Sequence, residues 1–265
     1  MIRAAFFDID GTLKPFDETE LRQSMIDTLH VLQEKGIRVF IATGRPPVQF
    51  DLLGRRLNEF PWDGYVMLNG QYCMDSHKKC FYEMPISEEA LKHLIPWLKE
   101  TADYPCQFLE LDYSYDIRFN PDQYAYLKSL GKENEMPPVE DPVRAYTHKT
   151  FQICPYIPAE KDAEWVSHAP GMKSARWTPA FADMIPAEGG KPVGMQKTLE
   201  HYGLKREESI AFGDGGNDIT MLEYAQIGVA MGNAADDVKQ HADYITDDCD
   251  QEGIQKALKH FGILS

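Results

Sequence analysis

The chain has 265 residues, enough for two domains, and its 43% hydrophobic and 26% charged residues are ordinary for a globular protein. A formal net charge of −15 at pH 7 disfavours a nucleic-acid partner, because the phosphates would be repelled. No apolar run approaches the roughly 20 residues that a membrane-spanning helix needs, and the N-terminus lacks the pattern of a secretory signal. Five cysteines without a C-x-x-C pair suit free thiols in a reducing cytoplasm, which is where we expect the protein.

The first part of the chain alternates strand and helix patterns. Apolar spacing predicts one helix that ends near Gly36 and a second helix over residues 48–58. Apolar runs predict buried strands on either side of these helices, over residues 2–9, 37–42 and 65–68. This order of strands and helices is typical of a parallel, doubly wound sheet with right-handed crossovers.

The regular alternation stops near Glu83 and returns after Pro186. In the intervening segment we expect one helix that is capped at Ser87, a short helix near Pro121 to Leu130 and another near Glu160 to Ser167. Pro137, Pro138 and Pro142 predict a loop. The segment also predicts strands over residues 107–111, 115–119, 150–153, 174–178 and 182–185. We therefore expect a core domain of residues 1–83 and 187–265 that is interrupted by an α+β domain of residues 84–186.

The α/β pattern resumes in the last part of the chain. A helix is expected through Leu199, followed by strands over residues 209–212, 228–231 and 244–246. Helices are expected between and after these strands, over residues 221–225, 235–241 and 254–261. The fold class is therefore α/β, with a doubly wound parallel sheet as the core.

Polar side chains follow three of the predicted strands, and ligands of open α/β sheets bind at that end of the strands. Four carboxylates in one crevice would repel one another, and a divalent cation is the usual way to hold them together. Ligands that are all oxygen favour Mg²⁺ over zinc or copper. The residues are Asp8 and Asp10, then Thr43, then Asp214, Asn217 and Asp218.

Each of these segments also has a simpler interpretation. Asp8 to Thr12 could be a turn with local hydrogen bonds, and Gly213 to Asp218 could be a turn that caps a helix. Thr43 by itself is weak evidence for a site, and Lys191 by itself is weaker still, because most lysines are simply solvated. The complete set, with each member at its own strand end, favours a site.

The ordered set resembles the four motifs of the haloacid dehalogenase superfamily, and the whole chain is similar to its Cof-like sugar-phosphate phosphatases. The matching residues are Asp8-Ile9-Asp10-Gly11-Thr12, Thr43, Lys191 and Gly213-Asp214-Gly215-Gly216-Asn217-Asp218. The resemblance implies a Rossmann-like core and an inserted α+β cap of the C2 type, because the large insert lies between the second and third motifs. A cap of this kind excludes water and selects the leaving group.

The resemblance also implies roles for the acidic residues. Asp8 is the expected nucleophile, and it forms an aspartyl-phosphate that water later hydrolyses. Asp10 is the expected general acid and then general base, and Gly11 allows the sharp turn that brings both onto one side. The implied Mg²⁺ shell consists of Asp8, the Asp10 carbonyl and Asp214.

The remaining motif residues are expected to hold the phosphate or support the site. Thr43 and the backbone that follows it at Gly44 are implied as phosphate-oxygen donors, and Asn217 as a further phosphate partner. Lys191 is the expected cation between nucleophile and phosphate, with Lys197 as the other candidate for this motif. Asp218 is expected to orient Lys191 or metal-bound water.

The substrate is less defined by the sequence than the reaction. Arg45 could reach the leaving group, and a surface role or a salt bridge within the core is an equal alternative. Arg176, Trp177 and Phe181 could bind a sugar ring, but aromatic residues of this kind are more often packed in a core. We expect a monomer or a weak homo-oligomer.

These observations predict a Mg²⁺-dependent phosphatase for a small phosphorylated metabolite, with a sugar phosphate favoured by the resemblance. The alternatives are a phosphomutase, a phosphatase for a cofactor phosphate such as pyridoxal phosphate, and a catalytically silent binding protein on the same fold. The presence of all four motifs argues against the last of these.

Overall fold

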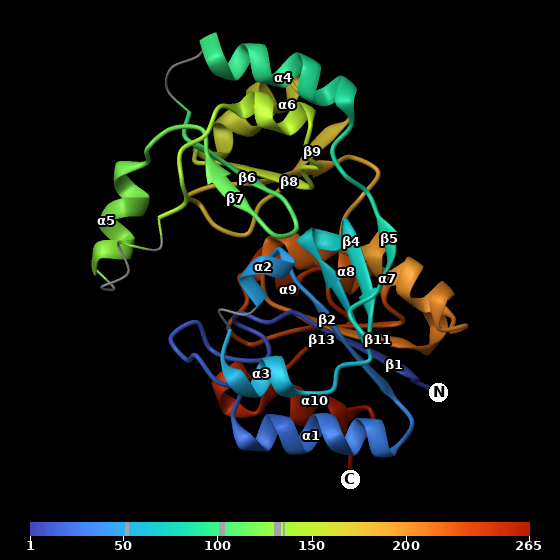
Figure 1. Ribbon diagram of the computed structural model, residues 1–265. Coiled ribbons are helices and arrows are strands. Elements are labelled where there is room, and N and C mark those ends of the chain that lie inside the picture. The colour runs from blue at the N-terminus through green and yellow to red at the C-terminus, as the bar shows by residue number, and fades with distance from the viewer. Residues whose placement is uncertain (51–52, 101–103, 130–133, 135) are drawn as a thin grey trace. The chain divides into compact units, whose positions relative to one another are not determined.

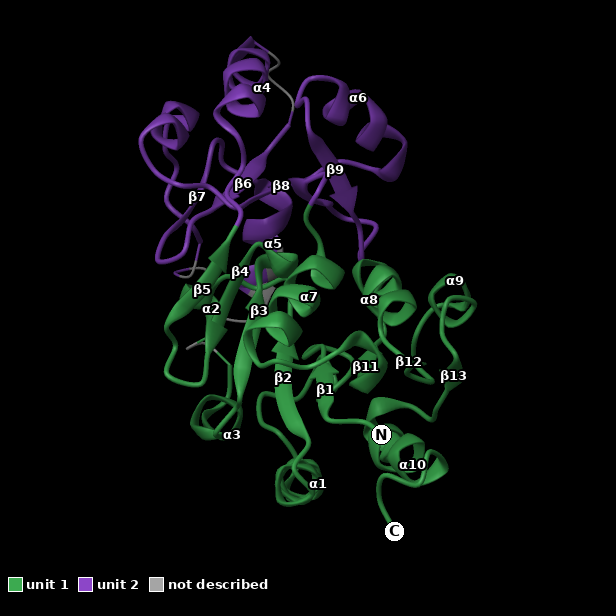
Figure 2. Cartoon of the chain, turned by 90° about the vertical axis from the view of Figure 1, so that its right-hand side faces the viewer, with its two compact units in different colours: residues 1–83, 189–265 green, residues 84–188 purple. Residues whose placement is uncertain are grey.

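The computed structural model describes residues 1–50, 53–100, 104–129, 134 and 136–265. The chain divides into two compact units, shown in different colours in Figure 2. Unit 1 comprises Met1–Glu83 and Gly189–Ser265, and unit 2 comprises Met84–Glu188. None of the helices within the described ranges is both long and apolar enough to cross a membrane.

Unit 1 is built on an eight-stranded sheet within the described residues, in the order β13-β12-β11-β1-β2-β3-β4-β5. The strands from β13 to β3 pair in parallel, whereas β4 and β5 are antiparallel at one edge. Their bounds are β1 (Ala4–Phe7), β2 (Arg38–Ala42), β3 (Gly64–Met67), β4 (Tyr72–Asp75), β5 (Cys80–Glu83), β11 (Ser209–Gly213), β12 (Ile227–Ala230) and β13 (Tyr244–Ile245). The predicted α/β class with a parallel core sheet is confirmed.

The helices of unit 1 cover both faces of this sheet, as Figure 1 shows. Phe7 and Ile41 pack into one apolar core with α1 and α10, while Phe6 and Phe40 pack into a second core with α7 and α8. Successive strand residues point to opposite faces, so both faces must be apolar, as the continuous hydrophobic runs indicate. The helices are α1 (Gln23–Glu34), α2 (Pro47–Phe50), α3 (Arg55–Glu59), α7 (Lys191–His201), α8 (Ile219–Tyr224), α9 (Asp236–Lys239) and α10 (Gly253–His260).

Two features of unit 1 differ from the sequence-based expectation. The single helix predicted over residues 48–58 is wrong, because α2 ends at Phe50 and α3 begins only at Arg55; residues 51 and 52 lie outside the described residues. Gly54 precedes α3 with a ψ of 154°, which no helix can continue through. The hairpin of β4 and β5 was not predicted, since both strands are short and the β5 side chains are only partly buried.

Unit 2 contains a five-stranded sheet within the described residues, in the order β7-β6-β8-β10-β9, and all of its strand pairs are antiparallel. Phe108, Tyr115, Ile153 and Met184 form its apolar face, which packs with residues of α4 and α6. The elements are α4 (Glu88–Glu100), β6 (Cys106–Leu109), β7 (Ser114–Asp116), α5 (Pro121–Ser129), β8 (Gln152–Pro155), α6 (Asp162–Ser167), β9 (Met172–Ala175) and β10 (Asp183–Pro186). This is the α+β composition expected of the insert.

The helices and strands of unit 2 have the predicted types, but several begin or end at other residues than predicted. The Ser87 hydroxyl accepts a hydrogen bond from the Ala90 backbone N–H, so it caps α4 as expected. The helix predicted near residues 121–130 is α5, and Leu130 lies outside the described residues. The described residues also form short 3₁₀ helices: η1 (Leu68–Gly70), η3 (Pro142–Tyr146), η4 (Ala159–Lys161), η5 (Arg206–Glu208), η6 (Gly216–Asp218) and η7 (Cys249–Gln251).

The buried carboxyl of Asp116, at the end of β7, should make the stability of the protein depend on pH. Its side chain is buried, neither carboxylate oxygen has a hydrogen-bond partner among the described residues, and burial raises its pKa to about 7. The folded state therefore holds this proton more tightly than the unfolded state, whose aspartates titrate near about 3.9. Stability from this group is complete below about pH 4 and is lost as pH rises to about 7.

Asp116→Asn should therefore be more stable than the wild type at pH 8, by about 2 kcal/mol, and should lose this advantage near pH 4. Urea unfolding of both proteins at several pH values measures the difference. A difference that does not change with pH would show that burial does not control the titration of Asp116.

Candidate active site

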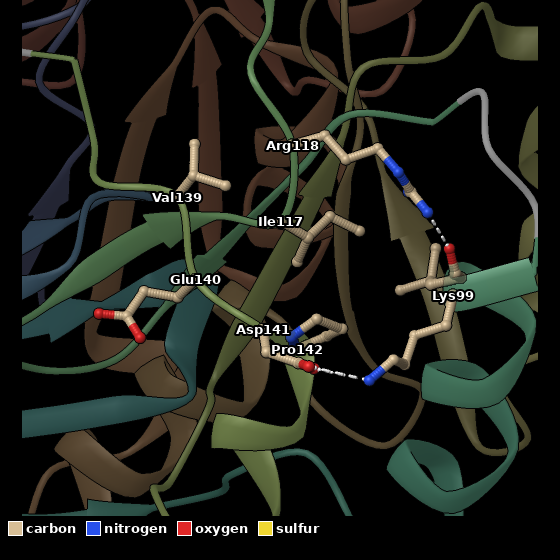
Figure 3. A pocket seen from close by; sticks show the side chains of 8 residues that line it. Lys99, Ile117, Arg118, Val139, Glu140, Asp141 and Pro142 are labelled. Atoms are coloured by element: carbon tan, nitrogen blue, oxygen red, sulfur yellow. Dashed lines mark hydrogen bonds and ion pairs between the residues drawn. The ribbon is translucent and has the colours of Figure 1, made fainter.

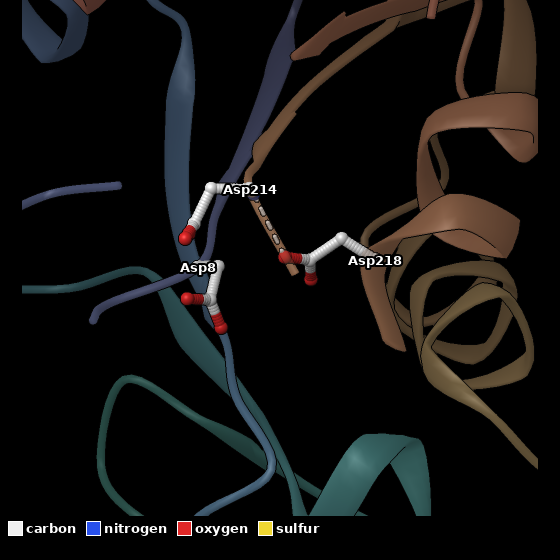
Figure 4. A group of neighbouring side chains, drawn as sticks. All are labelled: Asp8, Asp214 and Asp218. Atoms are coloured by element: carbon white, nitrogen blue, oxygen red, sulfur yellow. Dashed lines mark hydrogen bonds between the residues drawn. The ribbon is translucent and has the colours of Figure 1, made fainter. Parts of the chain in front are cut away.

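The ends of two neighbouring strands of unit 1 bring acidic residues together. Asp8 follows β1, and Asp214 follows the neighbouring strand β11, while Asp218 ends the short helix η6. One carboxylate oxygen from each of the three lies within 4.8 Å of the others (Figure 4). The sheet order thus creates a cluster from residues that are far apart in the sequence.

The turn after β1 shapes one side of this cluster. The Ile9 carbonyl accepts hydrogen bonds from the backbone N–H groups of Leu13 and Lys14, so the chain reverses direction at once. Gly11 has a φ of +86°, and a Cβ at this position would lie 2.2 Å from Asp214 Oδ2. A glycine is therefore required here both for the backbone conformation and for the close approach of Asp214.

Lys191, the first residue of α7, is the buried cation of the cluster. Its Nζ donates to Asp8 Oδ1 at 2.7 Å and to Asp218 Oδ1 at 2.5 Å, and its side chain is 0% exposed. Burial by itself would lower the pKa of Lys191, but Asp218 and Asp8 outweigh it and raise the pKa above its usual value. Lys197 instead lies exposed and pairs with Glu200, so Lys191 is the lysine that the fold places at the site.

Asp218 is fully occupied by protein contacts. While Oδ1 binds Lys191, Oδ2 accepts hydrogen bonds from the backbone N–H groups of Asp214 and Gly215, each at 3.0 Å. Asp218 therefore positions both the lysine and the loop that carries Asp214. Among the described residues, no hydrogen bond reaches Asp8 Oδ2 or Asp214 Oδ2, so these oxygens are available to a ligand.

The electrostatics of the cluster indicate that it needs a positive charge in addition to Lys191. Burial raises the pKa of Asp8 well above its usual value, against the effect of Lys191, and Asp218 and Asp214 raise it further. Burial and Asp218 raise the pKa of Asp214 to about 7. One lysine thus does not fully stabilise three ionised carboxylates, and the free oxygens of Asp8 and Asp214 are suitable ligands for a divalent cation.

Asp10 has a different environment from the cluster. Its carboxylate binds Lys14 at 3.0 Å through Oδ1 and Arg45 at 2.7 Å through Oδ2. Although burial opposes the effect, Arg45 and Lys14 lower the pKa of Asp10 below its usual value. Of the alternatives considered for Arg45, the structure shows the salt bridge within the core.

The remaining expected residues surround the cluster on neighbouring loops. Thr43 follows β2, is buried, and its Oγ1 accepts a hydrogen bond from the Arg45 N–H at 3.2 Å. Gly44 lies between them, and among the described residues its N–H has no hydrogen-bond acceptor. Asn217 in η6 donates from Nδ2 to the Asn69 Oδ1 at 2.9 Å.

Several contacts around the site involve residues to which the sequence assigned no role. Thr12 donates to Asp214 Oδ1 at 2.7 Å, Lys14 binds Asp10, and Asn233 donates to the Gly11 carbonyl at 2.8 Å. Asn69 could have been found, because it directly follows the strand that was predicted over residues 65–68. Lys14 and Asn233 carry no comparable signal, since lysine and asparagine are common in surface loops.

The proposed sugar-binding residues of unit 2 are engaged with one another and with the backbone. Arg176 binds Asp162 and donates to the Phe181 carbonyl at 3.0 Å, so its guanidinium is committed to the fold. The Trp177 and Phe181 rings meet edge to face with centroids 5.3 Å apart, and Trp177 remains 42% exposed. These contacts favour the interpretation as packed residues, although the exposed part of Trp177 is accessible.

Unit 2 also carries a groove of about 400 Å³, shown in Figure 3. Lys99 binds Asp141 across it, and Arg118 donates to backbone carbonyls of Tyr104 and Leu98. Its two cations are therefore already engaged, and its lining residues include no nucleophile paired with a base. The lining residues are Leu98, Lys99, Ile117, Arg118, Val139, Glu140, Asp141 and Pro142.

Comparison with known proteins agrees with this geometry. The family model of haloacid dehalogenase-like hydrolases matches residues 5–258. The phosphatase BT1666 of Bacteroides thetaiotaomicron has a similar structure, with a TM-score of 0.90 and 32% identity over 100% of this chain and 96% of that one. The subclass IIB sugar phosphatase BT4131 has a TM-score of 0.86 and 37% identity over 99% of this chain and 100% of that one.

A sequence relative gives the same result. YkrA of Bacillus subtilis, a provisionally named phosphatase, is 31% identical over 98% of this chain and 97% of its own length. The fold and the carboxylate–lysine cluster thus define a phosphoric monoester hydrolase. The chain belongs to the haloacid dehalogenase-like hydrolase family, whose phosphatases use a divalent metal.

Proposed function

We propose that the protein is a Mg²⁺-dependent phosphatase that hydrolyses small sugar phosphates through an aspartyl-phosphate on Asp8. The observation that carries the proposal is the buried cluster in which Lys191 holds Asp8 beside Asp214. A phosphate dianion is repelled by the Asp8 carboxylate unless positive charge is present at the same place. Lys191 supplies part of that charge and also stabilises the charge on the phosphoryl oxygens in the transition state.

The proposed reaction has two steps, and the second step regenerates the free enzyme. An Asp8 oxygen attacks phosphorus while the bond to the leaving oxygen breaks, and Asp10 gives a proton to that oxygen. Asp10 then takes a proton from water as the water attacks the aspartyl-phosphate, which releases phosphate and restores Asp8. Thr43, the Gly44 N–H and Asn217 are proposed to bind the phosphoryl oxygens throughout.

The partners of Asp10 bear on its two roles. With Arg45 and Lys14 bound, Asp10 is held ionised, which suits the base but not the acid. The Arg45 side chain is 35% exposed, whereas that of Lys14 is only 5% exposed, so Arg45 is the partner with room to move. We propose that Arg45 turns to the substrate on binding, which would raise the pKa of Asp10 so that it gains a proton.

The metal is proposed to be Mg²⁺ because the available ligands are all oxygen. The carboxylates of Asp8 and Asp214 would hold it together with the backbone carbonyl of Asp10. When bound, the ion would neutralise charge on the phosphoryl oxygens and orient the phosphate toward Asp8.

The affinity for Mg²⁺ should depend on pH. The pKa of Asp214 is about 7, so the metal has to displace a proton from this carboxyl at lower pH. We expect the apparent affinity to fall about tenfold for each pH unit below 7. Isothermal titration of the metal-free protein between pH 5.5 and 8 measures this slope, and Asp214→Asn is the control in which the slope should be shallower, because only Asp8 then has to lose a proton. Equal affinity at pH 6 and pH 8 would contradict the assignment of Asp214.

Sugar phosphates are proposed because the solved sugar phosphatase BT4131 is 37% identical along the full chain. A phosphatase for a cofactor-related phosphate remains the second candidate, since YitU of Bacillus subtilis, a 5-amino-6-(5-phospho-D-ribitylamino)uracil phosphatase, is 28% identical over 96% of this chain. Unit 2 is proposed as the cap that selects between such leaving groups.

A panel of phosphorylated metabolites, assayed for phosphate release with Mg²⁺, tests this proposal. We expect the highest kcat/KM for hexose and pentose phosphates, and no release by Asp8→Asn. Conversion of a sugar phosphate into a positional isomer without phosphate release would indicate a phosphomutase. A wild-type protein that releases no phosphate from any ester would favour the silent binding protein.

A further inference from the structure

A strained segment follows β3 at the edge of the candidate active site. Leu68, Asn69 and Gly70 have φ values of +53°, +53° and +92°, so all three lie in the left-handed region. This conformation is costly for leucine in particular, and it persists only where the surrounding structure imposes it. The contacts of the segment show what imposes it.

The segment is bound first to the loop that follows β2. The Leu68 N–H donates to the Arg45 carbonyl at 3.1 Å, and the Asn69 N–H donates to the Thr43 carbonyl at 3.0 Å. These two bonds fix the backbone on both sides of Gly44, whose N–H is proposed to bind phosphate. The left-handed turn is therefore what directs both N–H groups toward this loop.

The segment also lies against the residues that precede Lys191. A Cβ at Gly70 would be 2.2 Å from the Gly190 carbonyl oxygen and 3.1 Å from the Lys191 Cα. Only a glycine allows this close approach, so the start of α7 is set directly by the backbone at position 70. A second proposed catalytic segment is thus held by the same three residues.

The Asn69 side chain reaches the third segment. Asn69 is 1% exposed, and its Oδ1 accepts the hydrogen bond from Asn217 Nδ2 at 2.9 Å. Because the acceptor oxygen takes one hydrogen of the Asn217 amide, the second hydrogen of that NH₂ group has a defined direction. Asn217 is one residue before Asp218, which binds Lys191.

We propose that Asn69 is a positioning residue for phosphoryl transfer, which acts by orienting the amide of Asn217 toward the phosphate. This inference rests on the proposed function of the Asp8 site. The backbone of Leu68, Asn69 and Gly70 holds the loop after β2 and the start of α7. The Asn69 side chain adds the orientation of Asn217.

A double-mutant cycle separates the side chain from the backbone. Asn69→Gly removes the acceptor oxygen but keeps a residue that adopts positive φ without strain. We expect Asn69→Gly and Asn217→Ala each to lower kcat by about tenfold, as losses of supporting contacts do. Asn69→Gly should then have no further effect in the Asn217→Ala background, because the group through which it acts is gone.

Two further variants control for folding and for the chemistry of the acceptor. Lys78→Gly places glycine at another left-handed position, φ +58°, in an exposed turn, and should leave kcat unchanged. Asn69→Asp keeps an acceptor oxygen and also tolerates the left-handed backbone. Its kcat should stay close to that of the wild type, while the added negative charge raises KM for the phosphate ester.

The inference would be wrong if the two asparagine changes multiplied their effects on kcat. It would also be wrong if Asn69→Asp lowered kcat by about tenfold at saturating substrate, and this result can be measured even if Asn69→Gly fails to fold. Asp8→Asn in the same assay reports on the proposed function separately. An active Asp8→Asn protein would overturn the nucleophile, whereas an inactive one combined with multiplying asparagine effects would overturn the role of Asn69 alone.

Discussion

Asp8→Asn should lower the rate of phosphate release by at least about 1000-fold, because an amide cannot form the aspartyl-phosphate. Asparagine has the same shape as aspartate and carries no charge, and Lys191 keeps its ion pair with Asp218. The fold should therefore be retained while the reaction is lost. The measurement is phosphate release from p-nitrophenyl phosphate and from the best substrate of the metabolite panel.

A direct measurement of the intermediate makes this prediction specific to Asp8. Acid-quenched wild-type protein should carry a phosphoryl group on the peptide that contains Asp8, as detected by mass spectrometry, and Asp8→Asn should carry none. Asp27→Asn in the exposed face of α1 is the matched control and should behave like the wild type. A phosphoryl group on another residue, or an unchanged rate in Asp8→Asn, would overturn the assignment of the nucleophile.

Lys191→Met should have the largest effect on stability. Methionine has a similar length but no charge, so Asp8 and Asp218 would lose their shared cation inside the protein. Removing one partner of a buried ion pair typically costs about 3–5 kcal/mol in the free energy of unfolding. The same change should lower kcat by at least about 100-fold, because a charge next to the transferred phosphoryl group is lost.

Urea unfolding of the metal-free protein measures this loss of stability. Two further variants test whether the unpaired charges cause it. Adding Asp218→Asn to Lys191→Met should restore part of the stability but no activity, since one of the two unpaired charges disappears. Lys197→Met in the same helix removes only an exposed pair with Glu200 and should change stability by less than about 0.5 kcal/mol.

The stability lost by Lys191→Met should also decrease as pH falls. Burial raises the pKa of Asp8, and this carboxyl gains a proton more readily once Lys191 no longer opposes the shift. A protonated Asp8 no longer repels Asp218. If Lys191→Met were as stable as the wild type at pH 8, the lysine would not be the main counter-charge of the cluster.

The sequence by itself determined the class of fold, the order of the motifs and most of the strands of unit 1. These features depend on local chemistry: continuous apolar runs form strands that are buried on both faces, and polar residues directly after such strands lie at the ligand-binding edge of the sheet. Asp8, Thr43 and Asp214 could be selected on this basis because each follows its strand immediately. The hairpin of β4 and β5 could not, since an edge hairpin with partly buried side chains has no strong apolar pattern.

Only the tertiary structure decided which partner each site residue has. Lys191 rather than Lys197 reaches the acids because Gly70 allows the start of α7 to approach the end of β3. Asn69 contacts Asn217 across 148 positions in the sequence, and no spacing rule connects the two. Such contacts depend on the order of strands in the sheet, which is stabilised by packing of the whole core and is not written in any short segment.

The net charge of −15 likewise has one part that the sequence determined and one part that only the fold decided. The total could be counted from the sequence, and it disfavoured anionic macromolecules as partners. Its local distribution required the fold, which places Asp10 between two cations and places Asp8, Asp214 and Asp218 around one. The effect of a charge is set by distance and burial, and both are properties of the folded chain.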